Sequence, residues 1–310
     1  MHVAQLNGVP LPLAIDDAID DLSGVVLVGE HLLLGNDEGH HLLRCRLNPE
    51  IDRWELADTL KLGKGGQEAD IEALAYADGY LYAVGSHSLR RRVLKPAVHS
   101  VKHNRKRFGQ LVAEKARNRL YRIAFDRVSG QFGEIASISL SKRLRKNPLL
   151  APFSAVPSKE NGIDIEGLAL HRGQIYLGFR GPVLRHNLVP VMVLDFDHPK
   201  DYVLRFVDLR GQGIRDMVSL GDAMLVLTGP VGDGPGPFRL WLWDGQDQMP
   251  GVDAHFRPAQ RLGNLAVPEG GRAEGLALLH ASGDQVELLL VIDGIGQQRA
   301  QRISLSLPAR

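Results

Sequence analysis

The segment from Gly162 to Pro182, GIDIEGLALHRGQIYLGFRGP, contains the pattern that decides the fold. Two carboxylates, Asp164 and Glu166, stand at its start with one residue between them, so on a β-strand they point to the same side. An apolar run follows, then a polar turn, a second strand-like run and, just after that run, Arg180. The segment therefore predicts two strands joined by a turn, with charged side chains where the pair begins and ends.

Looser copies of this D-x-E-G pattern recur along the chain, beginning at residues 21, 70, 164, 214 and 272 and reading DLSG, DIEA, DIEG, IRDM and RAEG. Ser23 and Asp216 take the place of the glutamate in the first and fourth copies. Short alternating runs follow each copy, separated by Gly, Pro, Asp and Asn, which is typical of strands and turns. Units of about four strands with a period of about 50 residues are typical of β-propeller blades. We therefore predict an all-β fold, a single five-bladed propeller over residues 1–310. Six blades are the alternative, if residues 120–161 contain a degenerate one. The run His2–Leu6 is expected to supply the outer strand of the last blade.

An insert at residues 90–119 interrupts the second unit. It contains eleven Lys or Arg side chains and one acid, whereas the remaining chain carries 26 basic and 35 acidic side chains. Its apolar spacing predicts an amphipathic helix over about residues 97–116. A solvated surface helix, a lid or phosphate clamp at the channel mouth, and a nucleic-acid contact are the alternatives. Nucleic acid is disfavoured because Phe108 is the one aromatic residue beside the clustered charge.

The first strands of propeller blades line a central channel, so the repeated charged residues are expected to meet at one mouth. Carboxylate oxygens suit Ca²⁺ or Mg²⁺, and we predict one such divalent cation as the cofactor. Arginines at the same mouth would hold a small anionic ligand, and a histidine in the Ser-His-Ser turn would carry a proton. The alternative is that each acid caps backbone amides where its blade begins. The candidate metal ligands are Glu72, Glu166, Asp216 and Glu274, and the candidate catalytic residues are His87, Arg180 and Arg215.

Several classes of protein are disfavoured by composition. Cys45 is the one cysteine, so no disulfide can form within the chain. The net charge of +1 gives no general argument for a nucleic-acid or membrane partner, and no apolar run approaches the ~20 residues that span a bilayer. There is no G-x-S-x-G, H-E-x-x-H or C-x-x-C motif. With no signal peptide recognisable at the N-terminus, we expect a soluble cytoplasmic protein.

The runs GIDIEGLAL, GFRGP, LVPVMVL, GQGIRDM, LTGP and FRLWLWDG occur in this order, after DIEALAY and LYAVGSHS. Together they resemble the bacterial domain of unknown function 3616 family over about residues 65–295. The resemblance implies a β-propeller and brings no established activity. A weaker similarity, confined to the D-x-E-G-L signature, connects the chain with phytase-like esterase propellers, but that signature is shared too widely to imply a phosphatase.

Two functional hypotheses follow. The first is a divalent-metal-assisted hydrolase of a small anionic ester, phosphoester or lactone. The second is a non-enzymatic module that uses the same face to bind a ligand or a protein partner. The propeller fold does not decide between them, because function resides in the site.

Overall fold

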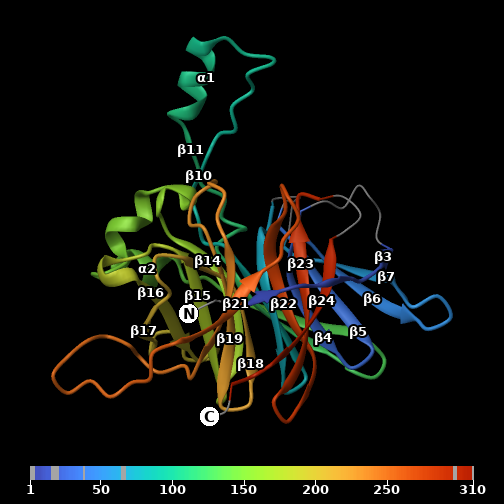
Figure 1. Cartoon of the computed structure of the whole chain (residues 1–310). Helices are drawn as coiled ribbons and strands as arrows, with labels where there is room; N and C mark the ends of the chain where they lie inside the picture. Colours follow the sequence, from blue (N-terminus) through green and yellow to red (C-terminus); the bar gives the residue numbers. More distant parts are fainter. Residues whose placement is uncertain (1–3, 15–20, 38, 64–67, 296–298, 309–310) are drawn as a thin grey trace.

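Five sheets stand around a central channel in the computed structural model of the chain, which describes residues 4–14, 21–37, 39–63, 68–295 and 299–308 (Figure 1). This arrangement is a five-bladed β-propeller and confirms the prediction. Residues 120–161 complete the second blade and its connection to the third, so they hold no sixth blade.

Each blade is built from strands that follow one another in sequence and pair antiparallel. The innermost strands are β4 (Leu22–Val28), β8 (Ile71–Ala77), β14 (Asp164–His171), β18 (Gly213–Leu220) and β22 (Arg272–Ser282). The second strands are β5 (His31–Asn36), β9 (Tyr80–Gly85), β15 (Gln174–Gly181), β19 (Ala223–Gly229) and β23 (Gln285–Asp293). The third strands are β6 (His41–Asn48), β12 (Leu120–Phe125), β16 (Leu188–Leu194), β20 (Phe238–Trp243) and β24 (Ala300–Ser306). The fourth strands of the first four blades are β7 (Arg53–Lys61), β13 (Phe132–Ile138), β17 (Val203–Asp208) and β21 (Gln260–Leu265).

The N-terminal segment closes the ring by adding one short strand to each of three blades. β2 (Val9–Pro10) pairs antiparallel with β24 and completes blade five. β1 (Gln5–Leu6) pairs parallel with β21 of blade four, and β3 (Leu13–Ala14) pairs parallel with β7 of blade one. The prediction that the run His2–Leu6 forms the outer strand of the last blade is therefore wrong for its described part, because Gln5 and Leu6 pair with blade four. Residues 2–3 lie outside the described residues. The three strands cover sheet edges that would otherwise be open.

The core lies between neighbouring blades, where apolar side chains of facing sheets form four clusters. The innermost strands approach one another so closely that small residues are needed. A Cβ on Gly24, in the glycine position of the repeat, would lie 2.7 Å from the Ala73 Cα of the next blade. The glycine of the D-x-E-G repeat thus serves the packing of blade against blade.

The insert forms an arm that rises from the ring above one end of the channel (Figure 1). Its stem is a pair of short strands, β10 (Arg90–Arg91) and β11 (Leu111–Val112), and its tip contains helix α1 (Val101–Phe108). The helix is shorter than predicted because Ser100 caps its N-terminus, accepting a hydrogen bond from the His103 amide, and Gly109 ends it. No residue of α1 is buried. We call residues 90–112 the arm.

The connection between blades two and three contains a short helix. It consists of α2 (Ser141–Lys146) and two 3-10 turns, η1 (Ala151–Ala155) and η2 (Ser158–Glu160). A third turn, η3 (Arg185–Asn187), precedes β16. Of the helices that the structure describes, none is long and apolar enough to cross a membrane.

Candidate functional site

A cavity of about 620 Å³ opens at the end of the channel below the arm. Antiparallel pairing brings the start of each innermost strand beside the end of the second strand, as Asp164 lies opposite Gly181. Charged residues at these two places therefore meet at the same end of the channel. The carboxylates in its wall are Asp37, Glu68, Asp70, Glu72, Glu160, Asp164, Glu166, Asp233, Glu274 and Asp293. The cationic residues are Arg90, Arg91, Arg92, Arg117, Lys159, Arg180, Arg215 and Arg272. We call this cavity the mouth pocket.

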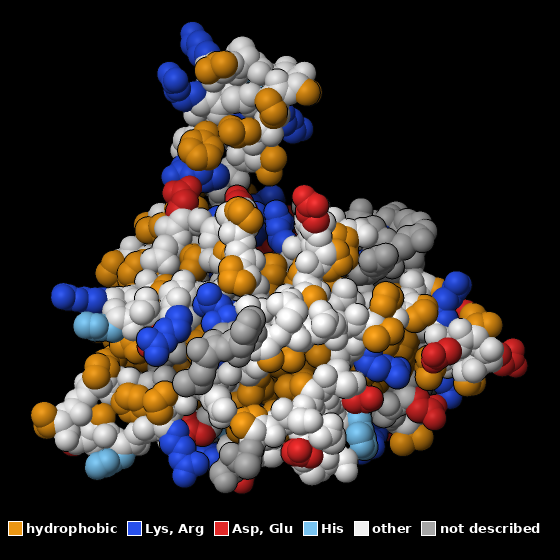
Figure 2. Space-filling view, viewed as in Figure 1, with side chains coloured by type: hydrophobic (Ala, Val, Ile, Leu, Met, Phe, Trp, Pro, Cys, Tyr) orange, Lys and Arg blue, Asp and Glu red, His pale blue; other side chains and the backbone are white. Residues whose placement is uncertain are grey.

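The channel changes character further in. A separate space of about 210 Å³ is lined by three successive residues from each innermost strand, and nearly all of them are apolar. Polar chemistry is therefore confined to the mouth pocket, whose charged groups gather below the arm in Figure 2.

Three buried arginines line this pocket, Arg117, Arg180 and Arg215, and the last two lie on the side of blades three to five. Arg180, at the end of β15, forms ion pairs with Asp164 and Glu166, both on β14. The distance from Arg180 Nη1 to Glu166 Oε1 is 2.7 Å. Arg215, on β18, contacts Glu166 Oε2 at 3.3 Å and also pairs with Glu274 of the next blade. The two guanidinium groups therefore connect blades three, four and five, and they hold the acids of those blades in one network.

Three carboxylates of blades two and three lie together beside Arg180. Oxygen atoms of Glu72, Asp164 and Glu166 lie within 4.8 Å of one another. Burial raises the pKa of each, most strongly for Glu72, while Arg180 and then Arg215 oppose the rise for the other two. The pKa of Glu166 rises to about 8. Among the described residues, Glu72 has no hydrogen-bond or ion-pair partner. These oxygen donors fit a hard divalent cation.

The side of the pocket formed by blades one and five is also acidic. Burial raises the pKa of Asp37 to about 9, and the neighbouring carboxylates, Asp70 first, add to the rise. The pKa of Asp293 is raised as well, by burial and then by Glu274. The Arg272 guanidinium lies 3.8 Å from Asp293 and is half exposed, so this side is compensated less fully than the side near Arg180.

Asp216 lies outside the mouth pocket, contrary to its prediction as a metal ligand. Its side chain is fully buried. Oδ1 accepts a hydrogen bond from the Met217 amide at 2.7 Å, and Oδ2 accepts one from the Leu276 amide at 2.8 Å. Both oxygens thus serve the backbone, and the contact with Leu276 joins blade four to blade five. For Asp216 the geometry fits the alternative to metal binding, a carboxylate that caps backbone amides.

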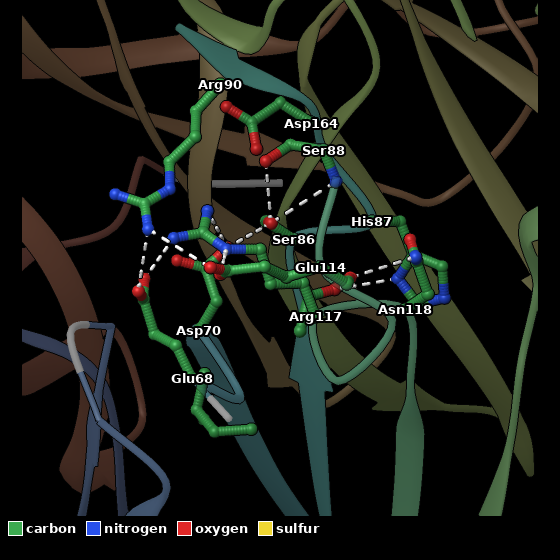
Figure 3. A network of polar contacts seen from close by, with 12 residues as sticks. Glu68, Asp70, Ser86, His87, Ser88, Arg90, Glu114, Arg117, Asn118 and Asp164 are labelled. Carbon is green, nitrogen blue, oxygen red and sulfur yellow. Dashed lines mark hydrogen bonds and ion pairs between the residues drawn. The ribbon is translucent and has the colours of Figure 1, made fainter. Parts of the chain in front are cut away.

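His87, predicted to carry a proton, is instead held by two hydrogen bonds to the backbone. Its Nδ1 donates to the Gly85 carbonyl at 2.8 Å, and its Nε2 accepts from the Leu140 amide at 3.3 Å. Burial lowers its pKa to about 4, so the ring is neutral. Figure 3 shows it apart from the carboxylates of Glu68 and Asp70. With both nitrogens engaged, the ring has no free atom with which to transfer a proton.

The sequence analysis missed the role of Arg117, at the end of the insert. Its Nη1 lies 2.8 Å from Asp70 Oδ2, its Nε lies 3.0 Å from Glu114 Oε2, and its Nη2 pairs with Glu68 (Figure 3). Arg90 joins the same acids, at 3.1 Å from Glu68 and 3.3 Å from Glu114. This network fastens the stem of the arm to blade two. Nothing distinguished Arg117 from the other ten basic residues of the insert except its place where the chain re-enters the ring.

A family model described as "Protein of unknown function (DUF3616)" matches residues 21–305. The chain belongs to the DUF3616 family. The match confirms the resemblance found in the sequence and extends it across nearly the whole ring of this DUF3616 protein. No curated protein matches the chain by sequence.

Several solved structures are similar to this chain. The glutaminyl cyclase of Myxococcus xanthus is 11% identical, with 99% of this chain and 100% of that chain covered and a TM-score of 0.51. GH43B of a xyloglucan locus from Bacteroides ovatus is 12% identical, covers 98% and 54% of the two chains, and has a TM-score of 0.49. The aldose sugar dehydrogenase of Streptomyces coelicolor is 14% identical, covers 96% of both chains, and has a TM-score of 0.39. At such identities the likeness to the first shows the fold alone.

Proposed function

We propose that this DUF3616 protein holds one divalent cation at Glu72, Asp164 and Glu166, and that it hydrolyses a small anionic ester, phosphoester or lactone at the mouth pocket. The observation that carries the proposal is the close approach of these three carboxylates, within 4.8 Å, directly beside Arg180. Glu274, on blade five and bound to Arg215, borders the same space.

Electrostatics supports the cation. Burial raises the pKa of Glu72 first, because it disfavours the charged form. Repulsion from the neighbouring carboxylates raises it further. Arg180 forms ion pairs with Asp164 and Glu166 but, among the described residues, none with Glu72. A divalent cation would take the place of the protons that these groups otherwise hold. When bound, it would polarise the scissile group and lower the pKa of a water molecule.

The arginines support an anionic ligand. Arg180 and Arg215 are each less than one tenth exposed, and the Nε atom of each has no hydrogen-bond partner among the described residues. Guanidinium groups bind carboxylates and phosphates through paired hydrogen bonds. Lys159, Arg92 and Arg272 at the rim add positive charge where a ligand would enter. The two buried arginines would orient the anionic group so that the ester bond lies near the carboxylate cluster.

Calorimetry with Mg²⁺, Ca²⁺ and Mn²⁺, with metal analysis of the purified protein, tests the cation site. Glu72→Gln and Glu166→Gln should each weaken binding at least tenfold, whereas Asp233→Asn should not. Asp233 is a suitable control because it lies in the same wall, pairs with Lys159 at 2.7 Å and is largely exposed. A panel of phosphate monoesters, carboxylic esters and lactones then tests hydrolysis. Absence of cation binding to the unaltered protein would refute the metal site.

A second candidate, binding without catalysis, is favoured by the state of the Ser-His-Ser turn. The Ser86 hydroxyl donates to Asp70, and both ring nitrogens of His87 are engaged, so this turn supplies no nucleophile and base pair. The two functions are separated by recovering the ligand: a hydrolase returns products, whereas a binding module returns the ligand unchanged. A protein partner would be detected by pull-down with the intact chain.

A further inference from the structure

The arm supplies an apolar wall to a pocket that is otherwise charged. Val93, Leu94 and Phe108 line the mouth pocket, and they are 67%, 45% and 50% exposed. We call these three residues the apolar wall. Large apolar side chains exposed beside a binding site mark a surface that a partner covers. Figure 2 shows such side chains on the arm, among Lys and Arg, above the charged mouth.

The apolar wall is held in a fixed position. The Arg91 guanidinium lies over the Phe108 ring, 4.9 Å from its centroid, and its Nη1 donates to the Phe108 carbonyl at 2.9 Å. The Nη2 of Arg91 donates to Glu160 of the connection between blades two and three, also at 2.9 Å. Arg107 donates from Nε to the Val93 carbonyl at 3.1 Å, so the two sides of the arm are joined. A surface organised in this way is ready to bind before a ligand arrives.

Cations stand directly beside the wall. Arg90, Arg91 and Arg92 precede Val93 in the chain, and all of them line the same pocket. A ligand that contacts both groups must have an anionic group and an apolar group close together. Arg90 and Arg91 already pair with Glu68, Glu114 and Glu160, whereas Arg92 has no ion pair among the described residues. A small, fully polar anion would leave the wall exposed, and an uncharged apolar molecule would leave Arg92 without a counter-charge.

We propose that the ligand of the mouth pocket is amphiphilic, with an alkyl or aryl group bound against Val93, Leu94 and Phe108 next to its anionic group. This inference rests on the proposed function, since it names the class of anionic ester that the site accepts. The arm is then the element that selects the ligand, and the ring supplies the chemistry. Val101, on α1 of the same arm, is 76% exposed and does not line the pocket, so it provides a matched control.

The test uses the full chain, Mn²⁺ and two pairs of non-hydrolysable anions: methylphosphonate with phenylphosphonate, and acetate with phenylacetate. Because an aryl group half covered by the apolar wall loses part of its contact with water, it should bind about tenfold more tightly than the methyl analogue. Phe108→Ala should reduce this ratio to about threefold or less and leave binding of the methyl analogue unchanged. Val101→Ala should alter neither, and melting temperatures should show that both variants fold.

Each outcome bears on the inference. Equal affinity of the unaltered protein for the methyl and aryl members of both pairs would overturn it while leaving the proposed function intact. An aryl preference that survives Phe108→Ala, or that Val101→Ala removes as fully, would overturn the assignment to the apolar wall. Failure of all four anions to bind in the presence of Mn²⁺ would overturn the proposed anion site and this inference with it.

Discussion

Removal of the Arg117 guanidinium should destabilise the protein, and the loss should grow with pH. In the substitution Arg117→Ala, Asp70 loses its cation and keeps only the Ser86 hydroxyl as a side-chain partner. Asp70 is 4% exposed, so water cannot replace the guanidinium. Glu68 and Glu114 are more exposed and still have Arg90. Almost the whole effect should therefore come from the buried Asp70 carboxylate.

The size and the pH dependence follow from Asp70. Burial raises its pKa from 3.8 to about 7 although Arg117 opposes the rise. Between these values the folded protein holds a proton that the unfolded chain has released, so stability falls as the pH rises. Without Arg117 the pKa rises further, and the fall continues above pH 7. An uncompensated buried charge costs about 3–5 kcal/mol. We expect a loss of about 3 kcal/mol at pH 8.5 and about 1 kcal/mol at pH 5, where Asp70 is protonated.

Urea unfolding at the two pH values measures this difference. Adding Asp70→Asn to Arg117→Ala should recover most of the loss at pH 8.5, because the amide cannot ionise. The control is Arg46→Ala, which removes an exposed ion pair with Glu30 and should cost about 0–1 kcal/mol at either pH. An Arg117→Ala loss of the same size at pH 5 and pH 8.5, without rescue by Asp70→Asn, would refute the reasoning.

Three further predictions concern the ring. Asp216→Ala should lower the free energy of unfolding by about 2–4 kcal/mol in urea titrations, because two buried backbone amides lose their acceptor. Gly24→Ala should cost about 1–3 kcal/mol, because its Cβ would lie 2.7 Å from the next innermost strand, whereas Gly234→Ala, with open space around it, should change little in the same assay. For His87, whose pKa falls from 6.5 to about 4 in the folded protein, stability should be lost as the pH falls through this range, by up to about 3 kcal/mol. His87→Leu should flatten that part of a thermal-denaturation pH profile.

The ring could be predicted from the sequence because its cause is local and repeated. Each copy begins an alternating strand, and three of the five copies add a glycine, Gly24, Gly167 or Gly275, that lets neighbouring blades approach. Both features are visible in a single strand's sequence. The course of the N-terminal segment was not visible, since Gln5–Leu6, Val9–Pro10 and Leu13–Ala14 are three two-residue strands of similar composition. Which sheet edge each one meets depends on the path across the ring, and no local pattern encodes that path.

The site was predictable in its location and less so in its members. Topology alone brings Glu72, Glu166 and Glu274 to one mouth, and the structure places all three in its wall. Topology could not predict that the Asp216 side chain turns to backbone amides instead. Strand alternation gives the face on which a side chain starts, but the choice between an open pocket and two nearby amides depends on the neighbouring blade.

The functional asymmetry of this pocket comes from residues that break the repeat. The repeated aspartate also has a structural role. Asp21 and Asp70, at the start of their blades, adopt positive φ angles of 63° and 53°, respectively. Aspartate tolerates this conformation better than most residues. Five equivalent acidic entrances would give a symmetric ring of mutual repulsion. Arg117, Arg180 and Arg215 have no counterparts in the other blades, and they compensate the acids of blades two to five unevenly. Among the described residues no cation forms an ion pair with Glu72, which lies where these networks meet. That uneven compensation is the physical reason to look for metal binding and chemistry there.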